Sequence, residues 1–514
     1  MKSKFKQFNI QQTAGFSTLE ILIAFALLTL IMSGIIIVVF GNDSFAIDSR
    51  LNNKALYFAE RDLNEARAQA DVDFLGFLGF EGTEDDGRYT TEVEVEGITP
   101  CKNLLRSTVS WSPTILRSQT VVLETIVSSI DEFLALDSDC PDEPLDEDDW
   151  KYPSSLASID FNPSGIPATD IDVDNGFVYI TANSTELGKH DLWAINVSDP
   201  DPLSPSIADS LDTGEGLFAV DVAGDYAYVA NNATSSQLIV VKLFDDLGDP
   251  DLQIKATSTL SGVNPAGSFP QAREIFYYDD HVYVGTWETA GPEFHVFTLD
   301  PNEVAGAAPD NPIHVGSREL NHSIRDIVVR GNYAYLATSG NQNELIVLDI
   351  SSPGSIDPSF PGVGQQEPWS FDADGNEDGT AVYILGSRTY LGRAKTGGGR
   401  PNFYIIDTMN PEDPQNQALA SGELVLTSNN SQVNGIYATD NLAFFSTMNP
   451  TVGFQIWDIS NLANLEPWPD CNINEYNHSE KTVGLDYDGK YIYVANESQN
   501  ALRIFWSNTG NICE

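Results

Sequence analysis

The sequence is poor in cysteine and in basic residues, and both shortages exclude classes of protein. Its 514 residues contain four cysteines, which are too few for a fold built on disulfides, and no Cys/His cluster has zinc-ligand spacing. Lys and Arg number 26 against 75 Asp and Glu, a formal charge of −49. Nucleic acids and anionic membranes are bound through dense Lys and Arg, so we expect neither as the main partner.

Recognisable catalytic motifs are also missing. The sequence has no Gly-rich phosphate loop, no nucleophile elbow and no H-E-x-x-H motif. Its six histidines show no metal-ligand spacing. We therefore predict no catalytic residues and a binding function rather than an enzyme.

The N-terminal region contains one long apolar run. Residues 16–40 are mostly apolar, which is long enough for a membrane-spanning helix, and Lys2, Lys4 and Lys6 precede them. Apolar residues then recur at three- and four-residue steps as far as Ala70. The pattern predicts one long helix over 16–70.

The segment Gly15-Phe16-Ser17-Thr18-Leu19-Glu20 resembles the class III signal of type IV pilins and pseudopilins. The resemblance implies a leader at 1–15, cleavage after Gly15 by a prepilin peptidase, and methylation of Phe16. It also implies that Glu20 pairs with the N-terminal amine of a neighbouring pilin subunit during filament assembly. The alternative is a plain signal anchor that contains an accidental glutamate.

The same resemblance implies a location and partners. The chain would sit in the inner membrane as a single-pass protein with a short cytoplasmic leader. The pilus assembly machinery would then move it to an extracellular type IV pilus-like filament of other pilin subunits.

Three stretches after the helix alternate between apolar and polar residues, at Tyr89–Val95, Leu105–Trp111 and Thr120–Val127. They predict a small antiparallel sheet packed on the helix, which is a pilin-like α+β head over 71–140 similar to minor pilins of the PilV type. Residues 141–155 are acidic and contain prolines, as is typical of an extended linker.

The rest of the chain, 156–514, is built on one recurring unit of about 50 residues, in which a tight turn precedes an aromatic strand. The strands are centred on Tyr179, Tyr228, Tyr283, Tyr335, Tyr390, Phe444 and Tyr493. Seven such units predict an all-β, seven-bladed β-propeller. The seventh unit lacks a fourth strand, and an orphan strand at Leu156–Phe161 precedes the first unit. We expect this orphan strand to complete the last blade and close the ring.

The third strands of two units, Gln237–Val241 and Glu344–Asp349, resemble the LVIVD-repeat family of β-propellers. The fold class is therefore multidomain, with a pilin-like α+β part followed by a propeller.

The cysteines lie where export to an oxidising compartment would allow pairing. Four cysteines allow three connectivities, of which we favour Cys101 with Cys140 and Cys471 with Cys513. Free thiols are the alternative.

An acidic loop is a candidate calcium site. Residues 374–379 fit D-x-[DN]-x-[DN]-G, which wraps oxygen atoms around a hard cation. Position 12 of the motif is Leu385, so a complete EF-hand is excluded. The predicted ligands of Ca²⁺ are Asp374, Asn376, Asp378 and the carbonyl of Thr380, and an ordinary acidic turn is the alternative.

Arg273 and Arg325 open innermost strands at equivalent places. They are expected to line one mouth of the central channel and to contact a ligand there, unless they only pair with neighbouring acids.

Together these features predict a minor or tip pilin subunit that displays an extracellular propeller for adhesion. Its target would be a surface, a glycan or a protein, because propeller loops form a broad platform on a rigid ring. The alternatives are a pseudopilin of a type II secretion machine and a filament-tethered hydrolase or lyase.

Overall fold

The computed structural model describes most of the chain, in two compact units that we treat separately. The described residues are 18–70, 74, 77, 79–84, 87–99, 102–114, 117–129, 150, 153–160, 166–186, 188–198, 204–262, 271–356, 369–394, 400–408, 411, 418–424, 426, 432–439, 441–450, 452–468, 481–497 and 501–506.

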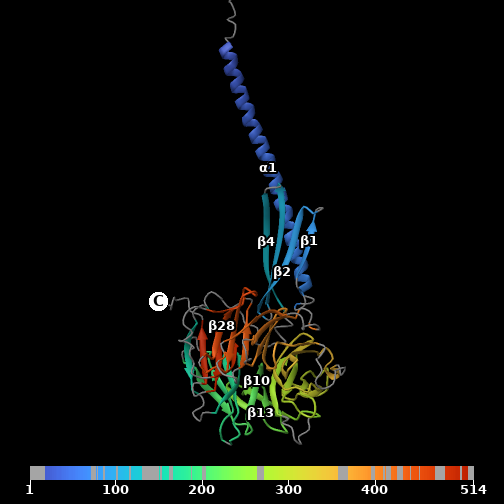
Figure 1. Cartoon of the computed structure of the whole chain (residues 1–514), viewed down its shortest axis with the longest axis vertical. Coiled ribbons are helices and arrows are strands. Elements are labelled where there is room, and N and C mark those ends of the chain that lie inside the picture. Colours follow the sequence, from blue (N-terminus) through green and yellow to red (C-terminus); the bar gives the residue numbers. More distant parts are fainter. Residues whose placement is uncertain are drawn as a thin grey trace, which may run out of the picture. The chain divides into compact units, whose positions relative to one another are not determined.

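The N-terminal unit contains one helix and one sheet (Figure 1). Helix α1 (Thr18–Ala70) corresponds to the helix expected over 16–70. The sheet is an antiparallel meander in sequence order, formed by β1 (Gly79–Glu84), β2 (Tyr89–Thr99), β3 (Lys102–Thr114) and β4 (Arg117–Ser128). Alternation of buried and exposed side chains along these strands leaves one apolar face to be covered.

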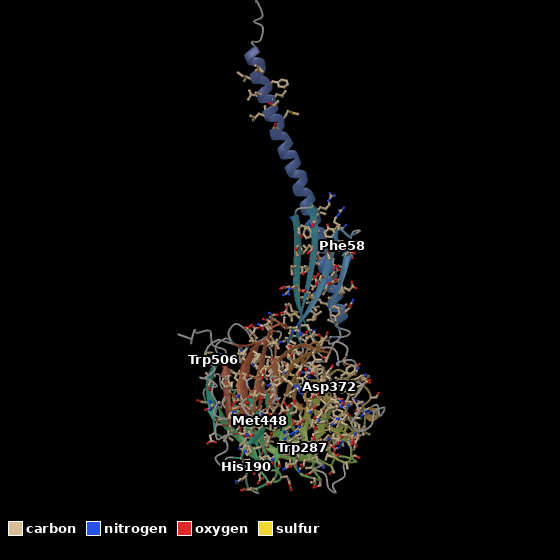
Figure 2. The ribbon with its side chains drawn as sticks, viewed as in Figure 1. Phe58, His190, Trp287, Asp372, Met448 and Trp506 are labelled. Atoms are coloured by element: carbon tan, nitrogen blue, oxygen red, sulfur yellow. The ribbon has the colours of Figure 1, made fainter. Side chains whose placement is uncertain are left out.

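The last part of α1 supplies that cover. Phe58, which is labelled in Figure 2, makes an edge-to-face contact with Tyr89 at 5.2 Å between ring centroids. Ala55, Ala59, Val109 and Trp111 complete the buried cluster. Small residues on the helix let the sheet approach closely, so this unit has a core of its own.

The predicted fold class needs correction. The described chain is predominantly β, in eight four-stranded sheets, and a pilin-like α+β class for residues 71–140 is not supported. We based that class on the pilin-like motif at 15–20 and on a helix followed by three alternating stretches, whereas the alternation that fills most of the sequence specifies strands.

The predicted location is also wrong. Within the part of the chain that the structure describes, no helix has both the length and the hydropathy of a membrane span. The inner-membrane, single-pass placement is therefore withdrawn.

Seven four-stranded antiparallel sheets form the blades of a propeller. In six blades the strands run in sequence order from the innermost to the outermost strand. The last blade takes its outermost strand from the start of the domain. Blade 1 comprises β6 (Ala168–Asp174), β7 (Phe177–Ala182), β8 (Leu192–Asn196) and β9 (Ser206–Leu211); blade 2, β10 (Leu217–Ala223), β11 (Tyr226–Asn231), β12 (Leu238–Phe244) and β13 (Pro250–Ser258); blade 3, β14 (Ala272–Tyr278), β15 (His281–Thr286), β16 (Phe294–Thr298) and β17 (Ile313–Arg318); blade 4, β18 (Ile324–Arg330), β19 (Tyr333–Gly340), β20 (Asn343–Asp349) and β21 (Ser370–Phe371).

The remaining three blades follow the same order. Blade 5 comprises β22 (Gly379–Leu385), β23 (Arg388–Arg393), β24 (Phe403–Asp407) and β25 (Ala418–Gly422); blade 6, β26 (Val433–Ala438), β27 (Leu442–Thr447), β28 (Phe454–Asp458) and β29 (Glu466–Trp468); blade 7, β30 (Thr482–Tyr487), β31 (Tyr491–Asn496), β32 (Leu502–Trp506) and β5 (Ser154–Ile159). A short 3-10 helix, η2 (Pro353–Ser355), follows β20.

Two independent contacts close the ring. Strand β5 pairs with β32, in register from Ile159 opposite Leu502 to Ser154 opposite Trp506, so the orphan strand expected at 156–161 occupies the predicted place. The Asp486 carboxylate of blade 7 accepts a hydrogen bond from the Val173 amide of blade 1 at 2.8 Å. Both ends of the domain are therefore held in one blade, and no open sheet edge remains at the junction.

The linker predicted at 141–155 ends inside the propeller core. Trp150 is 1% exposed and meets the ring of Phe444 edge-on at 5.2 Å. Its indole belongs to a buried cluster with Ile492 and Phe505, which lie in the neighbouring blade 7. A side chain in the acidic segment thus anchors the chain between two blades.

In five blades a polar side chain lies directly before the third strand or at its start, and it fixes the loop that follows the fourth strand. In each case its oxygen accepts a hydrogen bond from a backbone amide 22–29 residues later, at 2.7–3.1 Å. The five acceptors are Asp191, Gln237, Glu293, Glu344 and Asn402. These buried side chains satisfy loop amides that would otherwise lack a partner.

Candidate ligand site at the mouth of the central channel

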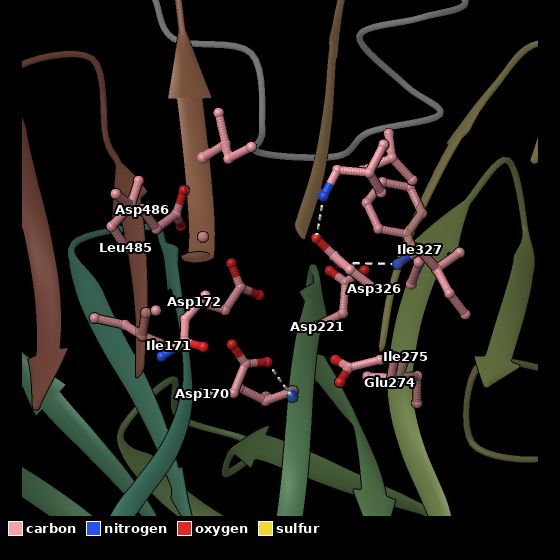
Figure 3. Close-up of a pocket in the computed structure, with 18 of the residues that line it drawn as sticks. Asp170, Ile171, Asp172, Asp221, Glu274, Ile275, Asp326, Ile327, Leu485 and Asp486 are labelled. Atoms are coloured by element: carbon pink, nitrogen blue, oxygen red, sulfur yellow. Dashed lines mark hydrogen bonds between the residues drawn. The ribbon is translucent and has the colours of Figure 1, made fainter. Parts of the chain in front are cut away.

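The innermost strands of the seven blades surround a cavity of about 220 Å³ (Figure 3). Every blade contributes to its wall, through β6, β10, β14, β18, β22, β26 and β30. The side chains at equivalent positions of these strands form successive layers, so the chemistry of the cavity changes along its axis.

A register shift recurs near the start of each innermost strand and sets the first layer. In blades 3 and 4 the pairing skips Arg273 and Arg325, and the other five blades skip the equivalent residue. Such a bulge lets two consecutive side chains depart from strict alternation. Arg273 and Glu274 both line the cavity as a result, and so do Arg325 and Asp326.

The two arginines lie around one indole. The guanidinium carbon of Arg325 is 4.6 Å from the ring centroid of Trp287, and that of Arg273 is 5.1 Å from the same centroid. Arg273 also lies 5.1 Å from the ring of Phe218. Trp287, labelled in Figure 2, comes directly after β15. Cation–π contacts of this kind hold guanidinium planes in place without consuming their N–H donors.

Each arginine has one acidic partner. Arg325 Nη2 donates to Asp378 Oδ2 at 2.8 Å, and Arg273 Nε lies 3.2 Å from Glu274 Oε1. The side chains of Arg273 and Arg325 stay 26% and 22% exposed, so solutes can reach them. Both predicted channel residues therefore line the cavity, and both also make the acidic pairings that were weighed as the alternative.

The next layer carries the carboxyl groups of Asp170, Glu274 and Asp326, which Figure 3 shows around the cavity. Asp170 accepts from the Val220 amide of the next blade at 3.0 Å, and Asp326 accepts from the Val382 amide at 2.7 Å. Burial raises the pKa of Asp170 to about 6 and that of Asp326 to about 7. Burial also raises the pKa of Glu274, although Arg273 opposes this effect. Asp326 is therefore only partly ionised near pH 7.

The layers deeper in the cavity are structural. Seven aliphatic side chains fill the third layer, namely Ile171, Val220, Ile275, Ile327, Val382, Ile436 and Leu485. Asp172 and Asp221 in the fourth layer accept hydrogen bonds from the amides of Val222 and Tyr277 in the following blades. These contacts join neighbouring blades, so chemistry available to a ligand is concentrated in the first two layers.

Several groups of the acidic loop predicted to bind Ca²⁺ instead bind arginine side chains. Asp378 binds Arg325, and the carbonyls of Asp374 and Glu377 accept from the guanidinium of Arg393 at 3.1 and 2.9 Å. Among the residues that the structure describes, no group of three or more His, Cys, Asp or Glu has a metal-binding arrangement. Calcium binding by Asp374, Asn376, Asp378 and Thr380 remains a prediction.

Several predicted residues cannot be placed. Gly15 and Phe16 lie outside the described residues, as do all four cysteines, Cys101, Cys140, Cys471 and Cys513. Glu20 lies in α1, but its side chain is not described. The cleavage site and both disulfides therefore stay predictions.

Sequence reasoning missed Trp287, Asp170 and Glu274. Trp287 follows a strand rather than lying within one, so strand periodicity does not indicate its position. Asp170 and Glu274 occupy the same position of an innermost strand as Asp326, which follows Arg325. This equivalence is the sequence signal that could have identified both acids.

The comparisons with known proteins agree with the repeat architecture. The LVIVD repeat family matches residues 219–241 and 323–360, which lie in blades 2 and 4 and include both strands on which the resemblance was based. No curated protein matches the chain. Neither comparison points to a pilin or a prepilin signal, so that part of the predicted family is not supported.

The solved structures that match the chain are distant from it in sequence. BamB from Moraxella catarrhalis is 11% identical with a TM-score of 0.40, over 70% of this chain and 99% of that one. A quinonprotein alcohol dehydrogenase-like protein from Bacteroides thetaiotaomicron is 11% identical with a TM-score of 0.36, over 80% of this chain and 86% of that one. The designed protein Ika8 is 10% identical with a TM-score of 0.41, over 68% of this chain and 99% of that one. The sheet topology of the chain and the family match show a seven-bladed β-propeller protein with LVIVD repeats in two of its blades.

Proposed function

We propose that this chain is a recognition protein whose propeller binds its target at the channel mouth formed by Arg273, Trp287 and Arg325. The observation that carries the proposal is the pair of reachable guanidiniums held around one indole at the opening of a cavity. Concave sites with a few oriented polar groups are where propellers and other rigid scaffolds bind ligands. Adhesion to a surface, a glycan or a protein is the use that we propose for this site.

The experiment compares binding of the full-length chain and three variants to immobilised glycans, proteins and mineral particles. Arg273→Ala/Arg325→Ala should lose at least about tenfold in apparent affinity for any target that the native chain retains, because each lost charged hydrogen bond is worth about 1.5–3 kcal/mol. Lys255→Ala is the matched control, since Lys255 is an exposed cation on the outer strand β13. Equal binding by the double variant and the native chain would place recognition elsewhere.

Catalysis is the alternative use of the same cavity. The raised pKa values of Asp170 and Asp326 would suit an acid–base pair in a hydrolase or lyase. Release of product from a polysaccharide by the native chain, together with its loss in Asp326→Asn, would favour that reading over simple binding.

A second proposal concerns α1. Its first half exposes large apolar side chains, with Leu22, Phe25 and Leu30 at 67%, 66% and 73%. Burying such a surface against other copies of the chain would be favourable, and pilus or secretion-pseudopilus assembly belongs to this proposal. Sedimentation of the full chain and of Phe25→Ser/Leu30→Ser would test it, and an unchanged association state in the variant would contradict it.

A further inference from the structure

We propose that the channel mouth recognises one carboxylated sugar residue, with the carboxylate held by Arg273 and Arg325 and the hydroxyl groups donating to the carboxyl layer below. This inference rests on the proposed function, because it names the ligand class of the same site.

The first step is the number of donors that the mouth still offers. A guanidinium has five N–H donors in a planar fork that matches a carboxylate. Within the described residues, Arg325 donates one hydrogen bond, to Asp378, and its Nε has no hydrogen-bond partner. Arg273 Nε also has no hydrogen bond of good geometry, although Glu274 lies beside it. Both Nε atoms are buried, so the donors open to an oxyanion are the Nη groups, of which only Arg325 Nη2 donates a hydrogen bond within the described residues.

The second step is the orientation of the two arginines. They occupy equivalent bulge positions in adjacent blades, and both lie against Trp287. A guanidinium that stacks on an aromatic ring loses less side-chain freedom when it binds an anion, because it is already ordered. The arrangement therefore favours a fixed, planar anion such as a carboxylate.

The third step is the local charge. The chain as a whole carries −49, so distant charges repel anions and only short-range contacts can hold one. Apart from Asp378, which binds Arg325, the carboxyl groups near the arginines are Glu274, Asp170 and Asp326, and burial raises the pKa of each of these three. Because burial raises the pKa of Asp326 to about 7, this carboxyl group is only partly ionised near pH 7 and compensates the arginine charges only in part.

The fourth step is the polar lining beside and below the arginines. Thr169 and Asn434 in the first layer, and Asp170 and Asp326 in the second, line the cavity with oxygen atoms that can accept from hydroxyl groups. A cavity of about 220 Å³ admits one small polar residue rather than an extended chain. A sugar that carries one carboxylate and several hydroxyl groups satisfies both layers, whereas an acidic amino-acid side chain offers few donors.

The test is calorimetric titration of the full-length chain with glucuronate, glucose, acetate, inorganic sulfate and an aspartate-containing dipeptide. Glucuronate should bind saturably at pH 7. Glucose and acetate should each bind at least about tenfold more weakly, because glucose lacks the carboxylate and acetate lacks the hydroxyl groups. Arg325→Ala should weaken glucuronate binding by about tenfold or more. Arg273→Lys/Arg325→Lys keeps both charges but not the fork, so it should also bind more weakly than the native chain.

Two controls separate binding from folding and from the proposed function. Thermal unfolding of each variant shows whether the propeller is intact, and Lys255→Ala should bind glucuronate like the native chain. Equal affinity for acetate, sulfate and glucuronate, or tighter binding of the dipeptide, would overturn the sugar assignment. If no oxyanion binds while Arg273→Ala/Arg325→Ala still loses surface binding, the ligand class is wrong and the proposed function stands. If glucuronate binds but surface recognition is unchanged in that variant, the proposed function fails instead.

Discussion

Removing the guanidinium of Arg393 should destabilise the propeller by about 3–5 kcal/mol, because it leaves a buried carboxylate without its charged partner. Arg393 Nη2 lies 3.1 Å from Glu344 Oε1, and both side chains are 0% exposed. The same guanidinium donates to the carbonyls of Asp374 and Glu377. One side chain of blade 5 thus fixes both a residue of blade 4 and the loop between the blades.

The loss should depend on pH. Burial raises the pKa of Glu344 to about 7 even though Arg393 opposes this effect. Without the arginine the folded-state pKa rises further above that of the unfolded chain. The folded variant then binds the proton more tightly than the unfolded one does. The stabilisation that protonated Glu344 gives the folded variant is present at low pH and is lost as pH rises through the folded-state pKa. The free energy of unfolding of Arg393→Met should therefore be closer to that of the native chain at pH 5 than at pH 8.

Guanidinium chloride unfolding of the full-length chain, followed by tryptophan fluorescence at pH 5 and pH 8, measures the effect. Glu344→Gln/Arg393→Met should recover part of the loss at pH 8, because Gln can still accept from the Ala373 amide without a buried charge. Arg388→Met, on the same strand β23 but half-buried, is the matched control. A loss below about 1 kcal/mol in Arg393→Met at both pH values would refute the reasoning.

Three further predictions concern other parts of the chain. Trp150→Ala should cost about 3–5 kcal/mol in the unfolding assay, because a fully buried indole against Phe444 is removed, and a loss near zero would mean that this contact is not formed. If the acidic loop binds Ca²⁺, millimolar Ca²⁺ should raise the Tm of the native chain and not that of Asp374→Asn, whereas equal Tm values with Ca²⁺ and a chelator would exclude the site. Intact-mass measurement of the chain from its native host should give an N-terminus at methylated Phe16, and a retained leader ahead of Gly15 would contradict the processing prediction.

The repeat architecture could be read from the sequence because it is encoded locally. Each blade repeats a tight turn and an aromatic strand, and alternation along each strand specifies which face is buried. Asn175 and Gly176, with φ of 48° and 78°, show how directly a turn sequence determines a hairpin. The missing fourth strand of the last unit was enough to predict that β5 would complete it. By contrast, the motif at 15–20 and the apolar run at 16–40 led to a pilin-like class and a membrane location that the described structure does not support.

The sequence by itself therefore determined the number of blades, the closing strand and the place of Arg273 and Arg325 at the start of innermost strands. Only the tertiary structure decided which side chains meet there. Trp287 contacts Arg325, Asp378 binds Arg325, and Glu344 binds Arg393, and the latter two pairs join residues about one blade apart in sequence. Local periodicity says nothing about such contacts, because they depend on how neighbouring sheets twist and where each innermost strand bulges.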